Sequence, residues 1–159
     1  MAASKGKNIY LNPGLYCIEG GINLEGNSTM SSSGGVTLYF LSGGMDLSGN
    51  NGNGNKNASK VTLEAPTDTT NYGIPGLVIY FDDLNPSTLD LRGTADSVIR
   101  GTILVPKGSV ELGGNSTLSE PVDGQVIAYK LKVHGTAELK INYNQGTTYK
   151  GSETLDMLR

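Results

Sequence analysis

Five short segments of the 159-residue chain share one pattern, in which apolar and polar residues alternate and a glycine follows. The segments are residues 22–26, 45–49, 89–93, 110–114 and 131–135. The closing glycines of the first two lie 23 residues apart, and those of the last three lie 21 residues apart. Two-residue alternation indicates β-strands, and a recurrence of this length indicates a solenoid of stacked coils. The pattern therefore predicts a β-solenoid in which most residues are structural.

Each coil is predicted to contain three strands, because one apolar run precedes every patterned segment and another follows its glycine. The preceding runs are residues 15–18, 36–41, 77–81, 102–105 and 125–129, and the following runs are residues 28–30, 59–63, 97–99, 116–118 and 138–141. We expect an all-β, right-handed parallel β-helix of about five coils of roughly 22 residues. Inward side chains of successive coils then stack into one apolar core, and glycines form the sharp corners.

The step from Gly49 to Gly93 spans 44 residues, about twice the usual repeat. We predict a single coil with two insertions, at residues 50–57 and 67–75. Residues 50–57 contain no apolar side chain, and residues 67–75 interrupt the apolar runs on either side. Two complete coils would need a further patterned segment, and the sequence has none there.

The composition indicates one domain of strands and corners, with 23 glycines, no tryptophan and 17% charged residues. We expect a polar leader at residues 1–8, the solenoid at residues 9–146 and a cap or tail at residues 147–159. In that tail the spacing of Leu155 and Leu158 suits a short capping helix.

A net charge of −3 provides no basic surface for nucleic acid. The longest apolar runs are too short to span a bilayer.

Several segments, read in order, resemble a bacterial surface family. They are residues 11–17 (LNPGLYC), 20–22 (GGI), 61–67 (VTLEAPT), 72–73 (YG), 76–80 (GLVIY), 101–106 (GTILVP) and 125–128 (QVIA). Together they are similar to the repetitive ectodomains of Flp/Tad pilus-assembly proteins (TadG-like) and PilX-type pilus-associated proteins, over roughly residues 11–143. Leu104 stands where the family often has an aromatic residue, and the family's additional cysteines, with any disulfide they make, are missing.

The resemblance implies an extracytoplasmic domain, at the bacterial cell surface or secreted, that is normally tethered by a membrane helix absent from this chain. It implies a role in pilus assembly, adhesion or surface structure. It carries over no catalytic residue and no cofactor.

The acidic residues provide the candidate metal ligands, although only weak ones. Asp82 and Asp83 form the only acidic pair, and Asp90 follows nearby. Asp46, Asp90 and Glu111 occupy matching positions in three repeats, so we expect them to stack about 5 Å apart. Carboxylates on adjacent coils can converge on a cation. The interpretation that we favour is a solvated polar face.

His134 is the only histidine and alternates with a predicted inward residue, so we expect it at the surface. The chain has no second histidine and no cysteine at ligand spacing, which argues against a zinc site. It also has no Gly-x-Ser-x-Gly elbow for a hydrolase triad. We expect Lys132 and Arg92 to interrupt the acidic positions or to pair with them.

The orientation of the aromatic residues is left open by the sequence. Tyr16, Tyr39, Tyr80 and Tyr129 recur in the apolar runs that precede the patterned segments. An inward aromatic stack is favoured over an outward stripe that binds sugar rings. Cys17 is the only cysteine, so it forms no internal disulfide, and its apolar surroundings predict a buried thiol.

The leading functional prediction is a non-enzymatic structural or adhesive domain of a pilus-associated or cell-surface protein. Its partners would be proteins, surface polysaccharide or further copies of the chain, bound through the loops, a lateral face or the strand edges. The alternative is a carbohydrate-binding or carbohydrate-cleaving β-helix, which requires clustered acids and exposed aromatics along one face. A further alternative is a bactofilin-like polymer-forming β-helix, although the bactofilin repeat is shorter.

Overall fold

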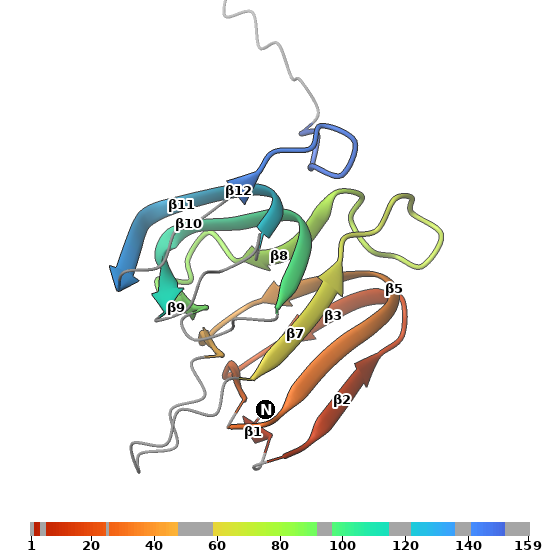
Figure 1. Cartoon of the computed structure of the whole chain (residues 1–159). Helices are drawn as coiled ribbons and strands as arrows, with labels where there is room; N and C mark the ends of the chain where they lie inside the picture. The colour runs from red at the N-terminus through yellow and green to blue at the C-terminus, as the bar shows by residue number, and fades with distance from the viewer. Residues whose placement is uncertain are drawn as a thin grey trace, which may run out of the picture.

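A computed structural model describes residues 2–3, 6–24, 26–47, 59–91, 97–114, 122–135 and 141–151. These residues contain no helix and form twelve strands of a single sheet. The strands are β1 (Ala2–Ala3), β2 (Asn8–Leu11), β3 (Gly14–Ile18), β4 (Ile22–Leu24), β5 (Thr29–Phe40), β6 (Met45–Asp46), β7 (Lys60–Glu64), β8 (Leu77–Phe81), β9 (Thr88–Asp90), β10 (Val98–Gly114), β11 (Val122–Gly135) and β12 (Ile141–Asn142). The sheet winds into the stacked coils of a β-solenoid (Figure 1), which confirms the predicted fold.

The strands stack in three columns, and all of the pairings within them are parallel. The first column contains β2, the start of β5, β7, the starts of β10 and β11, and β12. The second contains β3, the end of β5, β8, and the middle parts of β10 and β11. The third contains β1, β4, β6, β9, and the ends of β10 and β11. The five patterned segments therefore make up most of the third column.

The prediction of a single coil between Gly49 and Gly93 is confirmed, because β6 pairs directly with β9. Residues 67–75 form a loop between β7 and β8, as predicted. The predicted loop at residues 50–57, the predicted strand at residues 116–118 and the predicted cap at residues 155–158 lie outside the described residues. In the first column, the strand that stacks on Ile99 and Arg100 begins at Val122.

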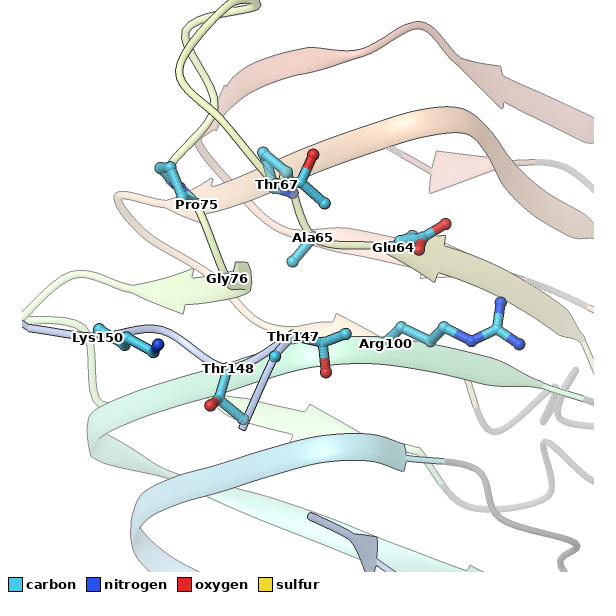
Figure 2. Close-up of a pocket in the computed structure, with 11 residues that line it drawn as sticks. Glu64, Ala65, Thr67, Pro75, Gly76, Arg100, Thr147, Thr148 and Lys150 are labelled. Carbon is cyan, nitrogen blue, oxygen red and sulfur yellow. The ribbon is translucent and has the colours of Figure 1, made fainter. Parts of the chain in front are cut away.

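The C-terminal segment, residues 143–151, lies against the outside of the second column. The backbone N–H of Tyr149 donates to Thr102 Oγ1 at 2.8 Å, and Thr148 is buried. Gly76 allows this approach, because its φ is +75° and a Cβ there would lie 2.5 Å from the backbone of Thr148. The segment thus runs beside the loop formed by residues 67–75 (Figure 2).

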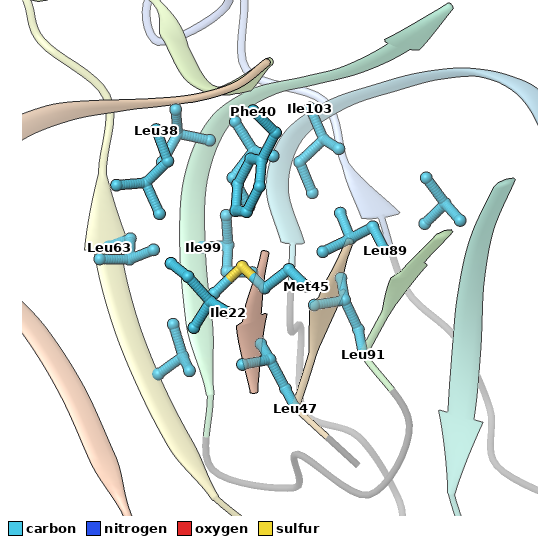
Figure 3. Close-up of a cluster of buried hydrophobic side chains, with 14 of the residues drawn as sticks. Ile22, Leu38, Phe40, Met45, Leu47, Leu63, Leu89, Leu91, Ile99 and Ile103 are labelled. Carbon is cyan, nitrogen blue, oxygen red and sulfur yellow. The ribbon is translucent and has the colours of Figure 1, made fainter. Parts of the chain in front are cut away.

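The core is a stack of aliphatic and aromatic side chains along the solenoid axis (Figure 3). Phe40 and Phe81 lie one coil above the other, with their ring centroids 4.7 Å apart and their planes tilted by 34°. The largest fully buried side chains of the core are Phe40, Phe81, Leu24, Met30, Leu38, Met45, Leu47, Leu63, Ile79, Leu89, Ile99 and Ile103. Burial of side chains of this size contributes about 1.5–3 kcal/mol each, so this column is the main source of stability.

Two orientations favoured by the sequence are wrong. Cys17 is exposed, because its side chain lies on the outer face of the second column. Tyr39, its register partner, and Tyr80 also point outward and are only partly buried. The inward aromatic stack is formed by the phenylalanines one residue further along each strand. Tyr16 packs against the core, whereas Tyr129 is exposed.

Candidate functional site

The outer surface of the second column carries a continuous apolar stripe, which we call the lateral stripe. In register order it consists of Cys17, Tyr39, Tyr80, Leu104 and Ile127. At its centre the rings of Tyr39 and Tyr80 stack, with centroids 5.0 Å apart and planes at 11°. The two tyrosines belong to successive coils, so their stacking follows from the strand spacing.

The two tyrosines are tied to the acidic pair that follows β8. Tyr39 donates its hydroxyl to Asp82 Oδ2, and Tyr80 donates to Asp83 Oδ1 at 3.1 Å. The other oxygen of Asp82 accepts the backbone N–H of Leu84 at 2.9 Å. The hydrogen bond to Asp82 raises the pKa of Tyr39 to about 12 and lowers the pKa of Asp82. Burial, and then the hydrogen bond to Asp83, raises the pKa of Tyr80.

The three weak metal candidates are divided between two parts of the solenoid. Asp82 and Asp83 lie beside the lateral stripe and accept tyrosine hydroxyls. Asp90 lies in the third column, where it pairs in register with Asp46 and Glu111. Within the described ranges, no group of three or more His, Cys, Asp or Glu side chains has the arrangement of a metal site.

The predicted stacking of Asp46, Asp90 and Glu111 is confirmed, and these residues line a shallow groove of about 530 Å³. The position one coil before Asp46 is held by Asn23. Lys132 Nζ lies 2.6 Å from Glu111 Oε1, and His134 Nε2 lies 3.3 Å from Glu111 Oε2. The last carboxylate of the ladder is therefore engaged by two basic side chains.

His134 is at the surface, as predicted, and its side chain lies beside Glu111. Lys132 pairs with the acidic positions, which confirms the second of the two roles considered for it. Arg92, which the sequence places beside the same acidic positions, lies outside the described residues.

The sequence did not reveal that the loop formed by residues 67–75 carries a highly exposed aromatic side chain. Tyr72 is 86% exposed at the end of a turn in which its N–H donates to Thr69 O at 3.2 Å. Its φ of 64° is unusual for a bulky residue, and such backbone often marks a functional position. The available signal was a tyrosine directly after the polar run of residues 67–71.

The base of this loop is attached firmly to the solenoid. Thr37 is buried, and its Oγ1 accepts the N–H of Ile74 at 2.9 Å and donates to Leu77 O at 2.8 Å. The N–H of Gly76 donates to Pro66 O at 2.8 Å, which closes the loop. The loop therefore holds Tyr72 out from the solenoid on a fixed base.

A small pocket of about 230 Å³ lies between the base of the loop and the C-terminal segment (Figure 2). Arg100 and Lys150 lie at opposite ends of it, and Glu64 lies on the same side as Arg100. Arg100 Nε is 3.7 Å from Asp123 Oδ2, so its charge is partly balanced outside the pocket. The pocket has an open, mixed polar lining with no convergent set of catalytic groups among the described residues.

Comparison with protein-family models, with curated proteins and with solved structures finds no match for this chain. In the part of the chain that the structure describes, no helix has the length and apolar character to cross a membrane.

Proposed function

We propose that this chain is a non-enzymatic structural and adhesive domain of an extracytoplasmic, pilus-associated or other bacterial cell-surface protein. The observation that carries the proposal is the presentation of Tyr72 on a loop whose base is fixed by Thr37. A tyrosine offers a large amphipathic contact area and loses little conformational entropy on binding. Preorganisation of the loop lowers the cost of binding further.

Three of the segments behind the family resemblance, residues 11–17, 61–67 and 72–73, support the same role, because they pack around the base of this loop. Gly35 and Gly73 leave room for Pro66, since a Cβ at either position would lie 2.3 Å from it. Pro13 lies against Gly34 in the same way, at 3.1 Å from a Cβ there. Pro13, Pro66 and Gly73 of these segments thus pack the corner from which residues 67–75 project.

The roles of the candidate carboxylates also favour a structural domain. Asp82 and Asp83 accept the hydroxyls of Tyr39 and Tyr80, and Glu111 is held by Lys132. A general acid or base must be able to exchange a proton with a substrate, and these contacts hold the groups in place within the solenoid.

The alternative is a carbohydrate-binding or carbohydrate-cleaving β-helix, and the groove beside Asp46 and Asp90 favours it. The lateral stripe argues against it, because the stacking of Tyr39 on Tyr80 covers one face of each ring and so reduces the ring surface that they offer to a sugar. Under this alternative, an acidic polysaccharide is depolymerised in the presence of Ca²⁺, and Asp90→Asn abolishes that activity.

The adhesive role is tested with beads that carry the purified chain on glass, mucin-coated and collagen-coated surfaces. Since truncation of an interface aromatic typically costs about 2 kcal/mol or more, we expect Tyr72→Ala to weaken attachment by roughly 30-fold. The matched control is Tyr10→Ala, which removes another tyrosine, 66% exposed, from a regular strand.

The proposal is supported if attachment falls for Tyr72→Ala and persists for Tyr10→Ala. It is contradicted if the two variants attach equally well, or if the unchanged protein attaches to none of the three surfaces.

A further inference from the structure

The last coil of the solenoid exposes side chains that point toward the axis. Val110 and Leu112 in β10 are fully buried, whereas their register partners in β11, Leu131 and Val133, are 48% and 55% exposed. Within the described ranges, the far side of β11 pairs with another strand only at Val122 and Asp123. Residues 125–135 therefore present an unpaired parallel edge with two apolar side chains beside it.

The opposite end of the solenoid has the complementary character. β2 and β3 form the first layer of the first and second columns, and their axial residues are only partly buried. These residues are Ile9, Leu11, Tyr16 and Ile18. One two-residue ladder lies at each end, β1 on β4 and β12 on β11. Both ends thus combine a longer open edge with a very short end strand.

We propose that a second copy of this chain docks head to tail on the open edge of β11. The coil formed by β2, β3 and β4 of the second copy lies on β11 as β11 lies on β10. Following the register through the columns places Ile22 and Leu24 of the second copy on Leu131 and Val133. The contact then repeats the parallel hydrogen bonding and axial packing between coils of one chain.

The second column fits this arrangement in detail. The same register places Tyr16 of the second copy on Val126 and Ile18 on Ala128, so large axial residues meet small ones. It also places Cys17 on Ile127, which continues the lateral stripe across the junction. The apolar columns inside and outside the sheet therefore extend from one copy into the next.

The junction requires an exchange of the short end strands. β12 of the receiving copy gives way to β2, and β1 of the arriving copy gives way to the end of β11. The strands that leave contribute two residues each, whereas β3 alone contributes five residues to the new contact. The exchange also covers Leu131 and Val133, and burial of such side chains is favourable.

The charges at the two ends are compatible with this contact. In the same register, Glu19 of the second copy follows Ile18 and lies next to Tyr129, beside Lys130. Lys132 faces Asn23, so no like charges meet in the third column. Opposite charges at a corner assist encounter, and salt weakens that part of the attraction.

The proposal rests on the structural role proposed above, in which the solenoid is a stiff rod, and it names a second copy as the partner. Its test is sedimentation velocity over a concentration series, which does not involve Tyr72. A chain that does not self-associate contradicts the docking proposal alone and has no bearing on bead attachment. Beads that do not attach contradict the adhesive role alone, because sedimentation measures self-association independently.

Two edge variants and one control distinguish the ends. Val133→Lys places a charge among the axial side chains at the open edge of β11, and Ile18→Lys places one among the axial side chains of β3. Leu84→Lys is the control, because Leu84 is an exposed apolar residue on the turn after β8, away from both edges. Circular dichroism verifies folding, and Leu11→Lys replaces Ile18→Lys if that variant is unfolded.

We expect the unchanged chain and Leu84→Lys to form species that grow with concentration, while each edge variant alone stays monomeric. A mixture of the two edge variants retains one intact edge of each kind, so it forms dimers that do not grow further. A monomeric unchanged chain at every concentration, edge variants that still assemble, or a mixture that stays monomeric would overturn the proposal.

Discussion

At the scale of the residue, the pairing of Tyr39 with Asp82 shows how outward side chains are fixed on this surface. The stacked rings of Tyr39 and Tyr80 are aligned by the coil spacing, and the acidic pair receives both hydroxyls. A carboxylate that accepts a hydrogen bond from a phenol hydroxyl favours the neutral phenol and its own ionised form, so the two pKa values move apart. The lateral stripe is therefore built from side chains with defined orientations.

We expect Tyr39 to resist ionisation until the pH approaches 12, because Asp82 raises its pKa to about that value. A tyrosine pKa raised by folding contributes stability that is complete below its ordinary value of 10.0 and is lost as the pH rises toward 12. The lowered pKa of Asp82 acts at the other end of the scale. Its contribution is present above its ordinary value of 3.8 and is lost as the pH falls through the lowered pKa.

The measurement is a titration of tyrosine absorbance, in which Tyr39→Phe identifies the contribution of this one residue. Asp82→Asn should move the Tyr39 pKa back toward 10, whereas Asp83→Asn should leave it high. A Tyr39 that titrates near 10 in the folded, unchanged protein would show that the hydrogen bond is absent.

At the scale of the element, the sequence predicts strands and their stacking better than it predicts which face each strand presents. The matching of Asp46 with Asp90 was predictable, because each stands at the same distance from a corner glycine. Which residues of the second column point outward was not predictable, because β3 and β8 carry apolar residues on both faces. Cys17 was placed wrongly for that reason, since periodicity needs a polar face to reveal the outside.

The presented loop could be located in the sequence but its aromatic tip could not. Residues 67–75 are set apart by composition and by Pro66 and Pro75. The exposure of Tyr72 depends on Thr37, 35 positions earlier in the sequence, whose hydroxyl fixes the loop base. Such long-range contacts are invisible to local pattern, whereas repeat length is not.

The corner between β3 and β4 provides a direct test of why a tight corner requires glycine. Gly20 and Gly21 both have positive φ, +79° and +82°. A Cβ at Gly20 meets nothing within 4 Å, whereas a Cβ at Gly21 would lie 2.5 Å from Gly44 O in the next coil. Gly20→Ala should therefore lose only the conformational term, roughly 1–2 kcal/mol.

Gly21→Ala should cost about 1–3 kcal/mol more than Gly20→Ala, because the carbonyl of the next coil must also move. The comparison is made from the free energies of unfolding in urea. Equal losses of unfolding free energy for the two variants would mean that the close approach of the next coil does not restrict the residue at this corner.

At the scale of the whole molecule, stability is expected to follow position along the solenoid axis. Each coil contacts only its neighbours, so the central coils are supported on both sides and the end coils on one. The burial of axial residues reflects this, since Leu89 is fully buried while Val133 is exposed. The open edge that we propose as a docking site is therefore also the part of the fold with the least support.

Native-state hydrogen exchange at low protein concentration should resolve this gradient. We expect the amides of β7, β8 and β10 to exchange only through global unfolding, and those of residues 125–135 to exchange through local opening at lower free energy. Leu89→Ala removes a central axial side chain and should lower protection by about 2–5 kcal/mol in the coils whose amides exchange through global unfolding. Val133→Ala, at the edge, should change protection only near β11. Uniform protection along the axis, or a Val133→Ala effect that spreads to β7, would show that the solenoid unfolds as one unit, in which case its end coil does not open separately to exchange strands with a second copy.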